Sequence, residues 1–344
     1  MDRDEQTTSK TEEEAAVAAA ARGGDEAAFA SLVGRYRREL QVHCYRMVGS
    51  FEDSEDLVQE TFLRAWRKRE SFQGRSTFRA WLYSIATNAC LDAIGRRPAR
   101  AAHAETATAG PGQPSEIPWL QPYPDELLEE IPVGDDEPDV AVVGRETIEL
   151  AFLVAIQHLP PRQRAVLILR DVLDWSAKET ASLLNASVAS VNSALQRARG
   201  TLKEHLPERR LEWAPGADPT EGERRLLERY MDASDRGDAA ALTDLLTEDV
   251  RFTMPPDPTV VVGLEAVVGY WVEGGFGESS WGELRTVLTR ANRQPAVANY
   301  LRRPGESEYR ALALDVLRIE EGRIVEVTAF GPEVFPAFGL PATL

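Results

Sequence analysis

The sequence has no apolar run long enough to cross a membrane. None of its apolar stretches approaches the roughly 20 residues that a membrane-spanning helix needs. The first residues, "MDRDEQTTSKTEEEAAVAAAARGGDE", are too acidic and polar for a signal peptide. We therefore expect a cytoplasmic protein that makes no contact with a membrane. Its 344 residues are too many for one ordinary core, so two or three domains are expected.

Cysteine is nearly absent, and histidine and lysine end early. Cys44 and Cys90 each lie in an apolar helical pattern, which indicates two buried thiols rather than a disulfide framework or a metal site. No His, Cys or Lys follows His205, so acid–base catalysis beyond it would need a carboxyl whose pKa is raised by burial. The candidates are Asp249, Asp257 and Asp315, although strand alternation in "LALDVL" allows Asp315 to point outward. We expect no enzymatic activity, no cofactor and no metal.

Basic residues are fewer than acidic residues, with 39 Lys and Arg against 56 Asp and Glu. The formal net charge is −17, and it is unevenly spread. Counted from the sequence, the net charge is −1 for residues 1–98, −8 for 99–145, +1 for 146–213 and −9 for 214–344. Two near-neutral blocks are thus separated by an acidic segment and followed by an acidic block. A DNA-binding protein needs local basic faces rather than a basic total, so this balance does not exclude nucleic acid as a partner.

Residues 25–98 are predicted to be helical, after a disordered tail over residues 1–24. "DEAAFASLVGRYRRELQVHCYRMVG", "DSEDLVQETFLRAWRK" and "STFRAWLYSIATNACLDAIGRR" each suit an amphipathic helix. Residues 99–145 are rich in Pro, Gly, Ala and acidic residues, as in a flexible linker that cannot build its own core. Within this linker "PWLQPYP" is unusually aromatic, and Trp119, Leu120 and Tyr123 would need a surface on which to dock.

Residues 146–211 return to helical patterns and contain a predicted helix-turn-helix. Ser176 is a good N-cap with Glu179 at the capping-box position, and Ser187 caps a second helix after a short turn. The apolar stripe of that second helix is Val188, Val191, Leu195, Ala198 and Leu202. Its other side suits a helix that reads base edges in the major groove, with Ser190, Asn192, Ser193, Gln196, Arg197, Arg199 and Lys203. An ordinary helical hairpin with a solvated basic face is the alternative.

Residues 215–344 are predicted to form an α+β domain with an antiparallel sheet. Two helical stretches precede "DVRFTMPPDP", a further helix over "GLEAVVGYWVEG" and a series of apolar or alternating runs. Glu321 and Gly322 are predicted to form a hairpin turn between the last two runs. Four aromatic residues either line a pocket or belong to the plain core: Phe252, Tyr270, Trp271 and Trp281.

Two segments carry a resemblance to a known family. "LPPRQRAVLILRDVLDWSAKETASLLNASVASVNSALQRARGTL" resembles the promoter-binding domain of bacterial sigma factors of the extracytoplasmic-function group. "FEDSEDLVQETFLRAWRKRESFQGRSTFRAWLYSIATNACLDAIGRR" resembles their other domain, which binds core polymerase and melts the promoter. Residues 215–344 resemble the SnoaL-like family, a cone-shaped fold around a pocket. The expected fold is therefore multidomain, with two all-α sigma domains, a flexible linker and a C-terminal α+β SnoaL-like cone-shaped barrel.

The resemblance implies roles for particular residues. The polymerase-binding helix would use Asp56, Gln59, Glu60 and Arg64. Opening of the −10 element would use Arg75, Arg79, Asn88, Arg96 and Arg97 toward the DNA, with Phe72 and Tyr83 available to stack on an extruded base. The −35 element would be read by the polar face listed above for the second helix of the helix-turn-helix. Many family members have basic residues at the positions of Asn192 and Ala194, so phosphate contacts here would be fewer.

The resemblance implies an alternative sigma factor that directs promoter-specific transcription initiation, with core RNA polymerase and promoter DNA as partners. We expect the C-terminal domain to regulate the same chain through contacts with the linker and the sigma domains, and an unknown small ligand stays open. The alternative is a SnoaL-like ligand-binding or enzymatic protein with an attached helix-turn-helix, acting as a one-component transcription regulator. The polymerase-docking helix and the melting segment discriminate between the two, because a simple regulator needs neither.

Overall fold

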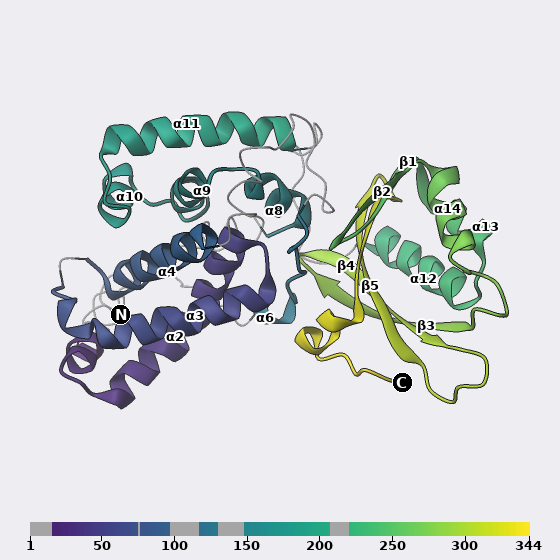
Figure 1. Cartoon of the computed structure of the whole chain (residues 1–344), viewed down its shortest axis with the longest axis horizontal. Coiled ribbons are helices and arrows are strands. Elements are labelled where there is room, and N and C mark those ends of the chain that lie inside the picture. Colours follow the sequence, from purple (N-terminus) through teal and green to yellow (C-terminus); the bar gives the residue numbers. More distant parts are fainter. Residues whose placement is uncertain (1–15, 75, 97–116, 130–147, 207–219) are drawn as a thin grey trace. The chain divides into compact units, whose positions relative to one another are not determined.

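The computed structural model describes residues 16–74, 76–96, 117–129, 148–206 and 220–344 (Figure 1). These residues fall into two compact units. The first unit contains the chain up to residue 96, residues 127–129 and 148, and residues 155–206; the second contains residues 117–126, 149–154 and 220–344. Among the described helices, none is both long and apolar enough to span a membrane.

The first unit is entirely helical. Residues 16–22 are already helical, with Ala18 and Ala21 buried, so the predicted disorder of residues 1–24 is wrong for this alanine-rich part. The elements that follow are α2 (Glu26–Val48), α3 (Phe51–Arg67), the short η1 (Arg69–Ser71), α4 (Phe78–Gly95), α6 (Glu126–Glu129), α8 (Leu150–Gln157), α9 (Pro161–Leu167), the π-helical η3 (Ile168–Val172), α10 (Ala177–Leu183) and α11 (Val188–His205). Of these, α6 and α8 start in the second unit and end in the first.

Local sequence explains where the long helices begin. The side chains of Asp25, Ser50 and Thr77 precede α2, α3 and α4, and each accepts a hydrogen bond from a backbone N–H of the first turn. The three helices pack on one another through buried residues such as Leu40 and Leu82. Cys44 and Cys90 are free thiols within this core, which confirms the prediction of their burial.

A buried arginine joins the two helical groups of the first unit. Arg164 of α9 is only 2% exposed, and its guanidinium donates to the carbonyl oxygen of Met47 near the end of α2. It also donates to the carbonyl oxygens of Gln157 at 2.8 Å and Leu159 at 3.1 Å. The Gln157 side chain in turn donates to the carbonyl oxygen of Arg46 at 3.1 Å. Two hydrogen bonds therefore cross from the α8–α9 region to α2.

The second unit is built on a six-stranded sheet in the order β2-β1-β6-β5-β4-β3. The strands are β1 (Leu246–Met254), β2 (Asp257–Val262), β3 (Glu283–Ala291), β4 (Gln294–Arg302), β5 (Arg310–Glu320) and β6 (Arg323–Phe330). Neighbouring strands are antiparallel, as predicted, except β1 and β6, which pair in parallel. Those two strands are far apart in sequence, and no short turn fixes their direction.

Helices cover one face of this sheet. They are α12 (Glu221–Asp235), α13 (Ala239–Thr243) and α14 (Leu264–Glu273), and a short helix η5 (Pro332–Phe338) follows β6. Leu226 and Leu227 of α12 share a core with Val297 of β4 and Leu317 of β5. The predicted hairpin turn is confirmed, because Glu321 (φ 51°) and Gly322 (φ 76°) connect antiparallel β5 and β6. This α+β arrangement agrees with the expected fold class.

Candidate nucleic-acid and polymerase interfaces

The predicted helix-turn-helix is formed by α10 and α11. Ser176 and Glu179 complete a capping box, with the Ser176 N–H donating to the Glu179 carboxylate at 2.8 Å. Ser187 caps α11, and its Oγ accepts from the Ser190 N–H at 3.1 Å. One residue of the predicted apolar stripe is misplaced, since Val188 is 43% exposed at the first position of the helix, before the stripe meets its packing partners.

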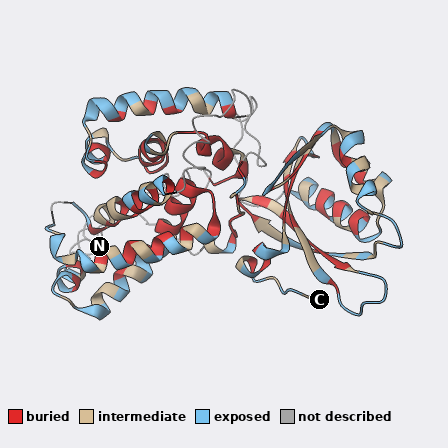
Figure 2. Cartoon of the chain, viewed as in Figure 1, coloured by how far each residue is buried: buried red, intermediate tan, exposed pale blue. Residues whose placement is uncertain are grey.

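The outer face of α11 is exposed along its length (Figure 2). It carries every residue predicted to read the −35 element: Ser190, Asn192, Ser193, Gln196, Arg197, Arg199 and Lys203. Two of the arginines differ in their surroundings. Arg197 donates to the Ser193 hydroxyl of its own helix at 3.1 Å, whereas Arg199 makes paired contacts with the Asp171 carboxylate at 2.7 and 2.8 Å. The Asp171 carboxylate raises the pKa of Arg199, and it also occupies the guanidinium that DNA would need.

The predicted polymerase-binding residues of α3 fall into two groups, one exposed and one held in ion pairs. Asp56 and Gln59 are exposed. Arg64 instead contacts Glu60 at 2.7 Å and Asp92 of α4 at 2.8 Å, and these carboxylates raise the pKa of Arg64. Glu60 and Arg64 therefore help to hold α3 against α4, in addition to any role toward a partner.

Sequence reasoning missed Leu63, which is 52% exposed on α3. It lies four residues after Gln59 and four before the exposed Arg67, so these three side chains share one helical face. That spacing was readable from the sequence. A leucine on an otherwise polar stripe can bury apolar area when a partner covers the helix.

The predicted −10 residues on α4 are partly exposed. Asn88 and Arg96 reach the surface. Arg79 instead pairs with Glu39 at 3.0 Å and lies 5.1 Å from the centre of the Tyr83 ring. Arg75 and Arg97 lie outside the described residues.

Tyr83 is not placed as expected. Its ring is 1% exposed and packs between His43 at 5.0 Å and Trp175 at 5.4 Å, so it cannot stack on a base in this conformation. Burial also raises the pKa of the Tyr83 hydroxyl. The aromatic group closer to the surface is Phe72, which is half-buried and contacts the rings of Phe78 and Trp81 at 5.4 Å each. Tyr83 was misjudged because the periodicity of its own helix does not reveal which other part of the chain covers its ring.

The aromatic part of the linker is docked, as its apolar composition predicts, although the linker as a whole was expected to be flexible. Leu120 and Tyr123 are buried, and they belong to the second unit. The Tyr123 N–H donates to Asn292 Oδ1 at 2.7 Å, and the Asn292 N–H donates to the Tyr123 carbonyl oxygen at 2.9 Å. The apolar side chains that needed a docking surface therefore find one at the turn between β3 and β4.

Asp125 strengthens the same contact. Its carboxylate accepts from the Arg293 N–H at 2.8 Å and pairs with Arg290 Nε at 3.2 Å. Burial raises the pKa of Asp125, while the bonds from Arg293 and Arg290 oppose this rise. Removing only one partner of such a buried ion pair is costly, because the other charge is then buried without compensation. The backbone of this segment adds a bridge between Pro124 and Ala291, so the linker extends the edge of the hairpin.

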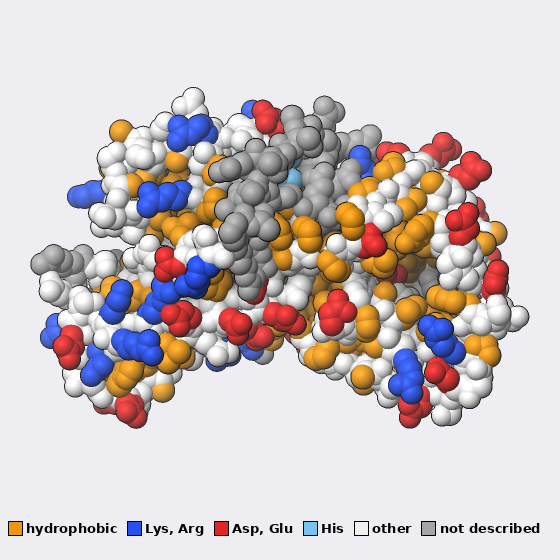
Figure 3. Space-filling view, viewed as in Figure 1, with side chains coloured by type: hydrophobic (Ala, Val, Ile, Leu, Met, Phe, Trp, Pro, Cys, Tyr) orange, Lys and Arg blue, Asp and Glu red, His pale blue; other side chains and the backbone are white. Residues whose placement is uncertain are grey.

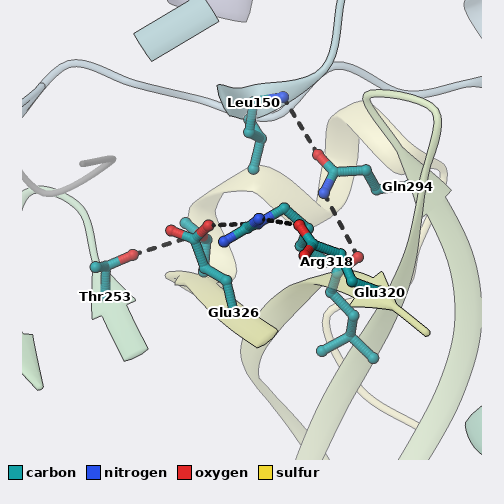
Figure 4. Close-up of polar contacts among 8 residues, drawn as sticks. Leu150, Thr253, Gln294, Arg318, Glu320 and Glu326 are labelled. Atoms are coloured by element: carbon teal, nitrogen blue, oxygen red, sulfur yellow. Dashed lines mark hydrogen bonds and ion pairs between the residues drawn. The ribbon is translucent and has the colours of Figure 1, made fainter. Parts of the chain in front are cut away.

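The start of α8 is held by the same domain (Figure 4). The Leu150 N–H donates to Gln294 Oε1 at 3.2 Å, and Gln294 Nε2 donates to the Leu317 carbonyl oxygen at 3.5 Å. Nearby on the sheet, Arg318 pairs with Glu326 at 2.9 Å and also contacts Glu320. The second unit therefore contains two segments of this region, residues 117–126 and residues 149–154.

The aromatic residues of the possible pocket do not form one group. Phe252 is buried, with Tyr270 at 5.5 Å and Trp271 at 5.7 Å, whereas Trp281 pairs with Phe276 at 6.3 Å. Phe252 therefore belongs to the core. Of the candidate acids, Asp249 and Asp257 are exposed, while Asp315 points toward α12, which favours the buried one of the two orientations that the sequence left open.

Figure 3 shows the charge on one face of each unit. Lysine and arginine side chains lie over α10 and α11, and acidic side chains gather over α13 and α14.

Comparison with known families assigns three parts of the chain. Family models match over residues 32–99 (Sigma-70 region 2), 149–202 (Sigma-70, region 4) and 227–327 (SnoaL-like domain).

Known proteins resemble large parts of the chain. The ECF RNA polymerase sigma factor SigG of Mycobacterium tuberculosis is 40% identical over 330 residues, which cover 92% of this chain and 85% of SigG. SigW of Bacillus subtilis, also an ECF RNA polymerase sigma factor, is 33% identical over 184 residues, covering 53% of this chain and 91% of SigW. The crystal structure of the M. tuberculosis extracytoplasmic function sigma factor SigJ has a similar fold, with a TM-score of 0.55 at 23% identity over 91% of this chain and 99% of SigJ.

These matches do not favour the alternative of a one-component regulator, because both sigma regions are present in order. The chain belongs to the extracytoplasmic-function RNA polymerase sigma factors and carries a SnoaL-like domain after its two sigma regions.

Proposed function

We propose that this sigma factor reads the −35 promoter element with the outer face of α11, and the exposure of that whole face is the observation that carries the proposal. Ser190, Ser193, Gln196 and Arg197 offer donors and acceptors to base edges, and Lys203 offers a charge to the backbone. Arg199 contributes less, because releasing it from Asp171 costs the pair of hydrogen bonds between them.

The face of α3 that contains Asp56, Gln59 and Leu63 binds core polymerase in this proposal. The Arg64 contacts to Glu60 and Asp92 fix the orientation of α3 on α4, so the exposed stripe is presented by a rigid helix. Asn88 and Arg96 on α4 lie toward the −10 element, where a melted strand offers phosphates and unpaired bases.

The C-terminal domain regulates these surfaces in cis by holding the linker. Two attachment points support this, namely the Tyr123–Asn292 contact and the Leu150–Gln294 contact. Tyr123 lies within the connection between the two sigma regions and Leu150 lies at its end, so the domain holds that connection at two points. Whether it activates or inhibits depends on which spacing of those regions the polymerase requires.

Reconstituted transcription tests this assignment. Purified full-length protein with core polymerase should start transcription at a defined promoter, and the double variant Asp56→Ala/Gln59→Ala should lose core binding while retaining binding of −35 DNA. Glu273→Ala serves as a matched control, since it removes an exposed carboxylate of α14 in the other unit. Wild-type-like core binding by the double variant would reject α3 as the polymerase surface.

A further inference from the structure

A polar cluster lies among apolar residues on the helix-covered side of the C-terminal sheet. Asp315 Oδ2 accepts hydrogen bonds from Asn299 Nδ2 at 2.8 Å and from the Tyr230 hydroxyl at 3.1 Å. Tyr230 belongs to α12, Asn299 to β4 and Asp315 to β5, so three elements converge on one carboxyl group. Burial raises the pKa of Asp315 to about 6, and the hydrogen bonds from Asn299 and Tyr230 oppose that rise. The sigma-factor surfaces described above make no use of this cluster.

A buried hydroxyl beside the cluster lacks a hydrogen-bond partner among the described residues. Thr286 pairs with Asn299 across β3 and β4, which places both side chains on the same face of the sheet. Thr286 is 8% exposed, and its Oγ1 makes no hydrogen bond within the described part of the chain. Buried polar groups in folded proteins are nearly always paired, and valine would fill the same volume without this cost. The hydroxyl therefore points to a group that the protein alone does not supply.

One oxygen of Asp315 is also available. Both hydrogen bonds go to Oδ2, and within the described residues Oδ1 accepts none. Asp315 keeps intermediate exposure although its chain neighbours Leu314 and Val316 are buried. The residues opposite it in the adjacent strands, Val297 and Ala329, are apolar and small, which leaves an apolar surround for this oxygen.

We propose that Asp315, Thr286, Asn299 and Tyr230 form a binding site for a small apolar molecule that carries a hydroxyl or amine group. Asp315 Oδ1 accepts a hydrogen bond from that donor, and the Thr286 hydroxyl pairs with a second polar atom of the same molecule. The side chains of this face around Val297 and Leu317 are apolar and fully buried, so the surroundings of the cluster suit an apolar body rather than a charged one. A carboxylate or phosphate is disfavoured, because the cluster contains a carboxyl and no cation and the region 214–344 has a net charge of −9.

Ligand-observed saturation-transfer NMR on the full-length protein tests the site with three probes. These are 2-phenylethylamine, 2-phenylethanol and ethylbenzene, which share an apolar body and differ in the donor group. We expect signal for at least one donor probe above that of ethylbenzene, and the stronger of the two identifies the donor as amine or hydroxyl. Asp315→Asn and Thr286→Val should each weaken that binding by about fivefold or more. The control Asp257→Asn, at an exposed carboxylate of β2, should leave binding unchanged.

Thermal unfolding separates a ligand role from a merely structural one. Thr286→Val should raise the melting temperature of the free protein, because it removes a buried hydroxyl whose hydrogen bond is unmade. A variant that is more stable and binds the donor probe less well supports the site. Equal signals for all three probes, no signal for either donor probe, or unchanged binding in both Asp315→Asn and Thr286→Val would overturn it.

Discussion

Replacing Tyr123 with alanine should release the linker from the C-terminal domain while the domain itself stays folded. The ring of Tyr123 is fully buried, and its backbone exchanges two hydrogen bonds with Asn292. Truncating a buried large aromatic side chain to alanine typically costs about 3–5 kcal/mol. Even the lower value corresponds to a shift of about 100-fold or more in the docking equilibrium, since about 1.4 kcal/mol is tenfold.

Hydrogen exchange reads this equilibrium at two backbone amides that the docked linker protects. The Asn292 N–H donates to the Tyr123 carbonyl oxygen, and the Arg293 N–H donates to the Asp125 carboxylate. Both amides should exchange faster by about 100-fold or more in Tyr123→Ala, while amides of the β4–β5 ladder keep their protection. Pro118→Ala, at an exposed position of the same segment, is the control. If the two amides exchange at the wild-type rate in Tyr123→Ala, the linker is not held by this contact.

Further predictions concern the surfaces and the core of the first unit. Leu63→Ala should weaken core-polymerase binding by about 1–2 kcal/mol with little change in melting temperature, measured by a binding titration, because an exposed leucine stabilises only a complex. Arg197→Ala should cost about 1–3 kcal/mol at the preferred −35 sequence and relax preference at one base pair, whereas Arg199→Ala should cost less and equally on all sequences, as titrations on variant DNA would report. Burial, with added repulsion from Arg46, lowers the pKa of His43 to about 3 from 6.5. The unfolded chain therefore binds a proton that the folded chain does not between these values, so the free energy of unfolding should fall by about 1.4 kcal/mol per pH unit below pH 6.5 on account of this group. Urea titrations at pH 7, 6 and 5 should show a shallower fall in His43→Gln, and equal slopes would refute this.

Features that depend on local sequence were predictable. Ser176 and Glu179 form the capping box that their spacing indicates, and the hairpin turn at Glu321 and Gly322 needs only the conformational preferences of two residues. The exposed face of α11 follows from helical periodicity, because its buried side is set by the apolar stripe within the same helix.

Features that depend on distant partners were not predictable. The sequence shows that Tyr123 needs a docking surface, but its partner Asn292 lies 169 residues away. Tyr83 was assigned to the surface because nothing in its own helix reveals that Trp175 covers it. The orientation of Asp315 stayed open, because strand alternation fixes two possible faces without saying which one the helices cover.

Arg164 shows how such a distant contact can influence function. Its guanidinium meets carbonyl oxygens near the ends of α2 and α8, where the helix dipoles favour a positive charge. If the two helical groups separate so that α11 and α4 reach different promoter elements, the bonds to Met47 and from Gln157 to Arg46 both break. Bonds that involve a charged group contribute about 1.5–3 kcal/mol and neutral ones about 1 kcal/mol, so opening costs several kcal/mol before water replaces them. Binding to polymerase and promoter would have to offset that cost, so we expect the closed first unit to weaken promoter binding by the free chain even when the C-terminal domain is left unchanged.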